Sequence, residues 1–139
     1  MSIPVGIAET ILEWTNEGHE YLYLEEPERM TQLELFLKTC KFEIDGDIYR
    51  RTDFKPILTA QKGDSIDLNR VSSWSTDLNI VNAKYENMIS VLLILGSEIV
   101  NGLDVSHLSS HPDESEILLA PIKLFVIDRT DDVLTVKVI

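Results

Sequence analysis

Apolar residues recur every three or four positions along the first 40 residues, which is the spacing of one face of a helix. The first repeat comprises Ile3, Ile7, Ala8, Ile11, Leu12 and Trp14. It predicts a helix that we expect to end at Gly18. A second helix is predicted from about residue 28 to residue 40, with Met30, Leu33, Phe36, Leu37 and Cys40 on one face. The segment between them, 21–24, favours helix or turn.

From residue 42 onward, short apolar segments separated by turn residues indicate strands. Asp45-Gly46 predicts a turn between strands at 42–44 and 47–49. Further strands are expected at 65–68, 71–75, 89–95, 117–127 (interrupted near Pro121) and 133–139, with a helix at 79–87 and loops at 57–63 and 107–113. The pattern predicts an α+β fold in one domain, residues 1–139, with a helical part over 1–41 and a β-rich part over 42–139.

The composition is acidic, and this narrows the possible partners. The 139 residues contain 24 Asp and Glu against 12 Lys and Arg, a net charge of −12. Such a surface repels phosphate backbones, so direct nucleic-acid binding is disfavoured and a basic partner is favoured. The longest apolar run, 89–95, is too short to span a membrane, and the N-terminus lacks the pattern of a secretory signal. Cys40 is the single cysteine, which excludes an internal disulfide, and we expect its thiol to be buried. We expect a protein that acts in the cytoplasm.

Candidate chemistry lies at the ends of three predicted strands. Glu114 and Glu116 stand two residues apart at the start of an apolar run, so both side chains can reach the same side of a strand. Upstream, Arg50 closes one strand and Ser75-Thr76 ends another. Paired carboxylates beside a buried strand are electrostatically costly, which favours a functional role over a structural one.

In this order, the motifs resemble those of the arginine-directed mono-ADP-ribosyltransferases. That family has Arg, Ser-Thr-Ser and Glu-x-Glu motifs along three strands that line one NAD cleft. The corresponding segments here are Tyr49-Arg50, Trp74-Ser75-Thr76-Asp77-Leu78 and Glu114-Ser115-Glu116 with its apolar run to Pro121. Lys62-Gly63-Asp64 and Ala83-Lys84-Tyr85 match the family in outline, and the resemblance covers residues 48–127. Two positions depart from the family pattern, since Arg51 replaces a usual Gly and Asp77 replaces the last Ser of the middle motif.

The resemblance implies helices followed by a β-rich two-sheet body with an NAD cleft, and an enzyme that transfers ADP-ribose from NAD to arginine side chains. Glu116 would stabilise the ribosyl cation, Glu114 would face the arginine acceptor, and Ser75 would hydrogen-bond Glu116. NAD is anionic, so Arg50 and Arg51 are the candidates for holding its pyrophosphate. The predicted catalytic residues are Glu116, Glu114, Ser75 and Arg50, and the predicted NAD-binding residues are Arg50, Arg51, Ser75, Thr76 and Glu116. Because neighbouring carboxylates raise each other's pKa, we expect activity to fall toward pH 5.

Other interpretations of the same residues stay open. A non-catalytic acidic binding or inhibitory module on the same fold is one alternative, and transfer of ADP-ribose to a base or to water is another. Trp74 is expected in the core, and Tyr85 is expected to pack a helix. His107 and His111 flank no third ligand, so we expect no metal site. The sequence contains no phosphate-binding loop and no glycine fingerprint of a dinucleotide fold. A phage-encoded modifier and a delivered effector both fit the chain.

Overall fold

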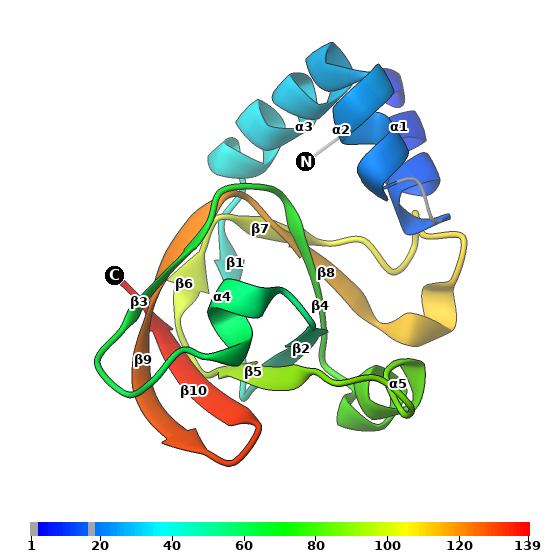
Figure 1. Ribbon diagram of the computed structural model, residues 1–139. Helices are drawn as coiled ribbons and strands as arrows, with labels where there is room; N and C mark the ends of the chain where they lie inside the picture. Colours follow the sequence, from blue (N-terminus) through cyan, green and yellow to red (C-terminus); the bar gives the residue numbers. More distant parts are fainter. Residues whose placement is uncertain (1–2, 17–18) are drawn as a thin grey trace.

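The N-terminal part of the chain forms a layer of three helices, seen from blue to cyan in Figure 1. A computed structural model describes residues 3–16 and 19–139. The helices are α1 (Val5–Thr15), α2 (His19–Glu25) and α3 (Pro27–Thr39). They confirm the two predicted helices and make the segment at 21–24 helical, whereas the predicted end at Gly18 lies outside the described residues.

Apolar side chains on the facing sides of these helices pack into one cluster. Its helical members are Ile7, Ile11, Trp14, Leu22, Met30, Leu33 and Leu37, each at most 9% exposed. Polar bonds at the edge of this cluster join α3 to α1, because Arg29 forms an ion pair with Glu13 and donates to Thr10 Oγ1 at 3.2 Å. Cys40 follows α3 and is buried as a free thiol, as predicted.

The rest of the described chain forms a curved sheet of eight strands and a separate two-stranded ribbon (Figure 1). The strands are β1 (Phe42–Glu43), β2 (Ile48–Thr52), β3 (Ser65–Leu68), β4 (Ser72–Ser75), β5 (Val91–Leu95), β6 (Ile99–Val100), β7 (Gly102–Asp104), β8 (Glu116–Leu119), β9 (Ile122–Thr130) and β10 (Val133–Val138). In the large sheet their order is β3-β9-β10-β5-β2-β4-β8-β7, and β1 pairs with β6. Only β5 and β10 run parallel among the described pairs. The predicted α+β class and its two-sheet body are therefore confirmed.

The structure corrects the predicted course of three segments. The turn at Asp45-Gly46 does not close a hairpin, because Phe42 pairs with Val100 of β6 instead. Within the predicted loop 57–63, Ile57 belongs to the short helix α4 (Lys55–Leu58) and is 3% exposed. A proline at the start of this helix and an apolar side chain directed into the core favour one turn of helix over a loop. The expected strand 89–95 begins at Val91, since Ile89 is 86% exposed.

Two apolar cores lie on opposite faces of the sheet, and the segment formed by Val71 and β4 contributes to both. Trp74 belongs to the core inside the curve of the sheet, as expected for it, whereas Val71 belongs to the core beneath the helices. Because side chains alternate along a strand, Ser73 and Ser75 share the face of Val71, toward the helical layer. On the neighbouring strand β8, Leu118 packs in that same core, so Glu116 lies on the same face. The helical layer and these polar side chains therefore meet on one side of the sheet.

Candidate active site

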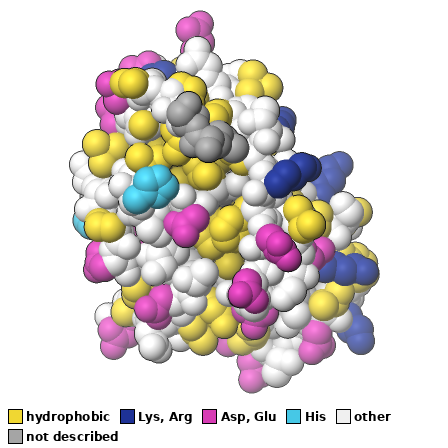
Figure 2. Space-filling model, turned by 180° about the vertical axis from the view of Figure 1, so that it is seen from behind, with side chains coloured by type: hydrophobic (Ala, Val, Ile, Leu, Met, Phe, Trp, Pro, Cys, Tyr) yellow, Lys and Arg dark blue, Asp and Glu magenta, His cyan; other side chains and the backbone are white. Residues whose placement is uncertain are grey.

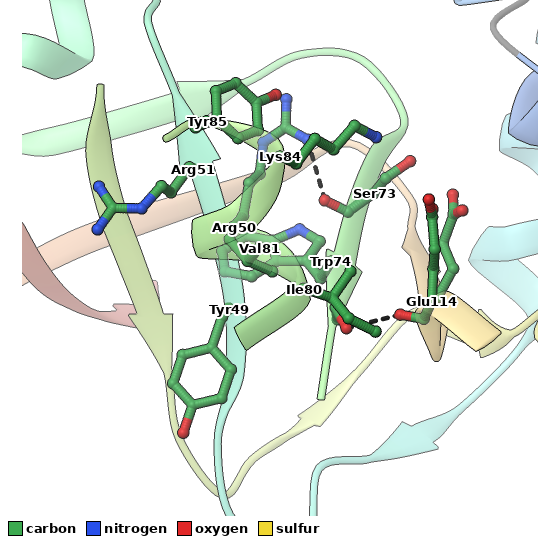
Figure 3. Close-up of a pocket in the computed structure, with 12 residues that line it drawn as sticks. Tyr49, Arg50, Arg51, Ser73, Trp74, Ile80, Val81, Lys84, Tyr85 and Glu114 are labelled. Atoms are coloured by element: carbon green, nitrogen blue, oxygen red, sulfur yellow. Dashed lines mark hydrogen bonds between the residues drawn. The ribbon is translucent and has the colours of Figure 1, made fainter. Parts of the chain in front are cut away.

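The three sequence motifs come together because their strands are neighbours. β2, β4 and β8 lie side by side in the sheet, with Tyr49 opposite Ser75 and Ser75 opposite Glu116. The short helix α5 (Leu78–Lys84) follows β4 and covers one side of the space between them. The result is a cleft with a cavity of about 120 Å³ that is partly open to solvent. Its lining residues are Tyr49, Arg50, Arg51, Ser73, Trp74, Ser75, Ile80, Val81, Lys84, Tyr85, Glu114 and Glu116 (Figure 3).

Glu116 is the buried carboxylate of this cleft, with 7% of its surface exposed. Burial raises the pKa of Glu116 above its ordinary value, because the charged form loses water. A hydrogen bond from the Ser73 side chain and the positive charge of Lys84 oppose this rise in the pKa, and the negative charge of Glu114 adds to it. The carboxylate of Glu116 is therefore less hydrated than that of a glutamate on the surface. The neighbouring side chains determine the pH at which it ionises.

The two serines of β4 act on different parts of the Glu114–Glu116 segment. Ser75 Oγ donates to the backbone carbonyl of Glu114 at 2.7 Å and accepts from the Asp77 amide at 3.0 Å. The predicted bond from Ser75 to the Glu116 carboxylate is therefore wrong, because that hydroxyl proton is used by a carbonyl. Ser73 is the β4 hydroxyl that acts on the carboxylate, since it lowers the pKa of Glu116. The sequence offered one indication of this role for Ser73. Residues two apart on a strand share a face, so Ser73 was expected on the same side of the strand as Ser75.

Arg50 lies next to these acids, with a partly exposed side chain whose Nε atom is buried. Its Nη1 donates to the Ser73 carbonyl at 3.0 Å, which ties β2 to β4 (Figure 3). Burial lowers the pKa of Arg50, while Tyr85 and Glu116 act in the opposite direction on that pKa. Among the described residues, no hydrogen-bond partner faces its buried Nε atom. A buried donor without a partner is rare in proteins and is expected where a ligand supplies the acceptor.

Arg51 and Thr76 are placed differently from the other predicted site residues. The guanidinium of Arg51 points away from that of Arg50 (Figure 3) and donates to Asn82 Oδ1 at 2.9 Å and Ser90 Oγ at 3.4 Å. It also lies 3.7 Å from a carboxylate oxygen of Asp132. Thr76 is exposed beyond the end of β4 and does not line the cleft. The structure thus brings together Arg50, Ser75 and the two glutamates, with Arg51 at the rim and Thr76 outside.

Helix α5 supplies a cation to the cleft that the sequence did not assign to the site. Its first turn is capped by Asp77, whose Oδ1 accepts from the amides of Asn79 at 3.0 Å and Ile80 at 3.4 Å. This cap orients the helix so that Lys84 and the following Tyr85 line the cleft. Lys84 lies one helical turn after Ile80 and Val81, which also line the cleft. This helical spacing could have predicted from the sequence that Lys84 faces the cleft.

The arrangement offers two complementary chemical features. A buried carboxylate can stabilise a positive charge that develops on a bound molecule, and a partly buried guanidinium can hold an anionic group. Within residues 3–16 and 19–139, no group of three or more His, Cys, Asp or Glu side chains is placed to hold a metal ion. Every helix in these segments is too short or too polar to cross a lipid bilayer.

Comparison with solved structures identifies the fold as that of the ADP-ribosyltransferase toxins. Plx2a, an ADP-ribosyltransferase toxin from Paenibacillus larvae, has a TM-score of 0.74 at 15% identity, covering 99% of this chain and 87% of Plx2a. C3stau2 from S. aureus, solved with NAD, has a TM-score of 0.75 at 13% identity, covering 99% of this chain and 88% of C3stau2. The predicted fold is therefore confirmed.

A third similar structure is the Vis toxin, an ADP-ribosyltransferase from Vibrio splendidus. It has a TM-score of 0.65 at 18% identity, covering 98% of this chain and 73% of Vis. Vis has also been solved in complex with agmatine. No protein-family model matches this chain, and no curated protein matches it in sequence.

Proposed function

We propose that this protein is an NAD-dependent mono-ADP-ribosyltransferase that modifies arginine side chains of a target protein and releases nicotinamide. The observation that carries the proposal is the convergence of Arg50, the β4 serines and the Glu114–Glu116 pair in one cleft. The likeness to ADP-ribosyltransferase toxins supports the reaction class, and C3stau2 was solved with NAD. The arginine acceptor rests on Glu114, as the resemblance implies.

The binding of NAD would depend on the Arg50 cation of the cleft. Arg50 has a buried Nε donor without a partner among the described residues, and a pyrophosphate oxygen is a suitable acceptor for it. Lys84 supplies a second positive charge in the same cleft. Arg51 would act from the rim, because its guanidinium is engaged by Asn82, Ser90 and Asp132.

The reaction breaks the bond between the ribose carbon and the nicotinamide nitrogen. Nicotinamide leaves with the bonding electron pair, and the ribosyl group becomes positively charged, as in glycoside hydrolysis. The Glu116 carboxylate would stabilise this cation, and Ser73 would orient the carboxylate. A guanidine nitrogen of the acceptor then forms the new bond to the ribose carbon and loses a proton, for which Glu114 is the nearby base.

The test uses agmatine, a small guanidine, as the acceptor, because the target protein is not required for it. Wild-type protein should release nicotinamide from NAD and form ADP-ribosyl-agmatine, both measured by chromatography and mass spectrometry. Glu116→Gln should lower both by at least about 100-fold, since the charge that stabilises the cation is lost. Glu114→Gln should lower agmatine modification while slow NAD hydrolysis continues. Full activity of Glu116→Gln would contradict the proposal.

The alternative is a non-catalytic acidic binding module on the same fold, suggested by Arg51 and Asp77 where the family has other residues. Calorimetric titration with NAD up to millimolar concentration separates the two functions. Binding that is lost in Arg50→Ala supports the enzyme, whereas no binding to wild type supports the module. Mass spectrometry of products formed in a cell lysate would identify the acceptor, and a base or water as acceptor would contradict the arginine assignment. The proposal places this activity in the cytoplasm, whether the protein is phage-encoded or delivered as an effector.

A further inference from the structure

The last turn of α1 reaches the candidate site from the helical layer. Trp14 is 4% exposed, and its ring meets that of Tyr23 edge-on with centroids 5.9 Å apart. Its indole Nε1 donates to Ser73 Oγ at 2.8 Å. An indole N–H is a donor and never an acceptor, so the hydroxyl of Ser73 must accept in this bond.

The bond from Trp14 controls the direction of the Ser73 hydroxyl proton. A serine hydroxyl has one proton, and an N–H that approaches its oxygen turns that proton toward another acceptor. Ser75 lies directly across from Glu116, and Ser73 is two residues away on the same face of β4. Glu116 is therefore the diagonal cross-strand neighbour of Ser73, a separation that a glutamate side chain can span. Both residues line the same cleft.

We propose that Trp14 is a positioning residue for Glu116, because its indole N–H holds the Ser73 hydroxyl as a donor toward the Glu116 carboxylate. This inference rests on the proposed function, since it assigns Trp14 a role in that reaction. It makes the N-terminal helical layer part of the site, although none of the described residues of that layer lines the cleft.

The same turn of α1 also contacts the loop that leads to the carboxylates. Thr15 Oγ1 accepts from the Ser110 amide at 3.0 Å. Two consecutive residues of α1 therefore bind both sides of the site, β4 through Trp14 and the segment before Glu114 through Thr15. The pairing of Arg29 with Glu13 and Thr10 fixes α1 against α3 behind these contacts.

Loss of the Trp14 bond should change how Glu116 titrates. The charged groups facing Glu116 are Lys84 on α5, Glu114 on the 3₁₀ turn η1 (Pro112–Glu114), His111 before it and Arg50 on β2. None of these is altered in Trp14→Phe. Without the N–H, the Ser73 hydroxyl is free to rotate away, and its lowering effect on the Glu116 pKa is lost. Since Glu116 acts as an anion, activity would then decline at a higher pH as the solution is acidified.

The first experiment compares pH profiles of kcat/KM for NAD cleavage. Trp14→Phe removes the N–H and keeps an aromatic ring against Tyr23, and Ser73→Ala removes the acceptor. Each should shift the acid limb to higher pH and lower kcat/KM about tenfold at the acid end, the effect of one charge-assisted hydrogen bond. The double variant should add no further shift. Tyr23→Phe is the matched control, because it removes bonds to Glu34 and to the Val71 amide within the same layer without touching Ser73. An equal loss of activity at every pH in Trp14→Phe would overturn the proposal.

The second experiment follows the indole N–H groups by ¹H–¹⁵N NMR and needs no enzymatic activity. The chain has two tryptophans, so the spectrum should show two indole signals. The Trp14 signal should move as Glu116 ionises, and this movement should disappear in Glu116→Gln. The Trp74 indole donates to Ser72 Oγ at 2.8 Å on the other face of β4 and serves as the internal reference. The proposal would be overturned if the chemical shift of the Trp14 signal did not change with pH, or if it changed with pH in Glu116→Gln as it does in wild type. If the Trp14 signal titrates with Glu116 but wild-type protein does not cleave NAD, the proposed function is refuted. The hydrogen bonding from Trp14 through Ser73 to Glu116 would still be supported.

Discussion

At the level of single residues, the cleft combines a buried carboxylate, Glu116, with a partly buried guanidinium, Arg50, and among the described residues these two form no ion pair with each other. Glu116 and Arg50 are each perturbed by burial, which disfavours the charged form of both. Structural side chains in a core are normally apolar or fully paired, because burying a charge costs free energy. Such a cost is tolerated at functional sites, where the charge acts on a ligand. The positions of Glu116 and Arg50 are therefore better explained by the proposed chemistry than by a structural role.

The buried carboxylate leads to a prediction about stability. Because burial raises the pKa of Glu116, the folded protein keeps this proton to a higher pH than the unfolded chain does. As pH rises from roughly 4 through the raised folded pKa, the unfolded state ionises first, and the free energy of unfolding decreases. Glutamine never ionises, so Glu116→Gln should melt at a higher temperature than wild type at neutral pH.

Thermal melts followed by circular dichroism from pH 3.5 to 8 would check this expectation. The melting-temperature difference between Glu116→Gln and wild type should be small at the acid end and should increase with pH. Glu9→Gln, an exposed position on α1, is the control and should show a difference of constant size. A Glu116→Gln protein that is less stable than wild type at neutral pH would mean that the native carboxylate is stabilised by its partners.

The residues of the site were predicted from sequence to different degrees. Arg50, Glu114 and Glu116 were found because each belongs to a short sequence motif, and these motifs lie on or directly before strands that are neighbours in the sheet. Ser73 was missed because its role depends on which of two serines on one face reaches the carboxylate. Trp14 was missed because it is more than 50 residues away from Ser73 in the chain, and only tertiary packing brings its N–H there.

At the level of elements, the positions that depart from the family pattern have local structural roles. Asp77 caps α5 by accepting from two backbone amides, which aspartate does well at a helix N-terminus. Arg51 connects β2 to α5 through Asn82 and to the start of β5 through Ser90. Both residues bind α5, the wall of the cleft that carries Lys84. The two departures therefore change how this wall is held and do not replace Arg50 or Glu116.

The strands that sequence patterns did not predict are themselves very short. β6 and β7 contain two and three residues, too few for an alternation to be recognised. β1 was assigned to a hairpin because Asp45-Gly46 is a strong turn signal, but Phe42 gains more by pairing with Val100 at the edge of the core. By contrast, β8, β9 and β10 were predicted closely, because long apolar alternation and clear turn residues define them.

The contact between β7 and β8 depends on a glycine and gives a prediction for this pair of strands. A Cβ atom added at Gly102 would lie 2.6 Å from Leu119 Cδ2 and 2.7 Å from the Leu118 carbonyl oxygen. The carbonyl belongs to the strand that carries Glu116 and cannot move without disturbing the pairing. Gly102→Ala should therefore lower the free energy of unfolding by about 2 kcal/mol, as overpacking does.

Urea denaturation followed by circular dichroism measures this change. The matched control is Gly6→Ala in α1, where a Cβ would meet no atom within 4 Å and alanine favours the helix by up to about 1 kcal/mol. The two glycine variants should thus change stability in opposite directions. Equal stability of Gly102→Ala and wild type would mean that β7 can move away from β8 at little cost.

At the level of the whole molecule, charge and topology determine how the parts act together. Acidic side chains are spread over the face in Figure 2, whereas Lys and Arg gather mainly along one edge. With a net charge of −12, the molecule attracts basic partners and repels polyanions over distances of about a Debye length. This charge suits the basic, arginine-bearing target of the proposed function, and Arg50 provides the local positive charge that the anionic NAD of that proposal requires.

The helical and β-rich parts of the molecule are expected to form one cooperative unit. Each of the two cores contains one tryptophan, Trp14 beneath the helices and Trp74 inside the sheet. Strand β8 contributes Ile117 and Leu119 to one core and Leu118 to the other, so neither core can unfold without disrupting the other. We therefore expect one unfolding transition. In Trp74→Phe, Trp14 fluorescence should report the same urea midpoint as circular dichroism, and in Trp14→Phe the remaining Trp74 should do so as well. A Trp14 midpoint at lower urea than the circular dichroism midpoint would show that the helical layer unfolds first, and the site would then lose its Trp14 contact while the sheet remained folded.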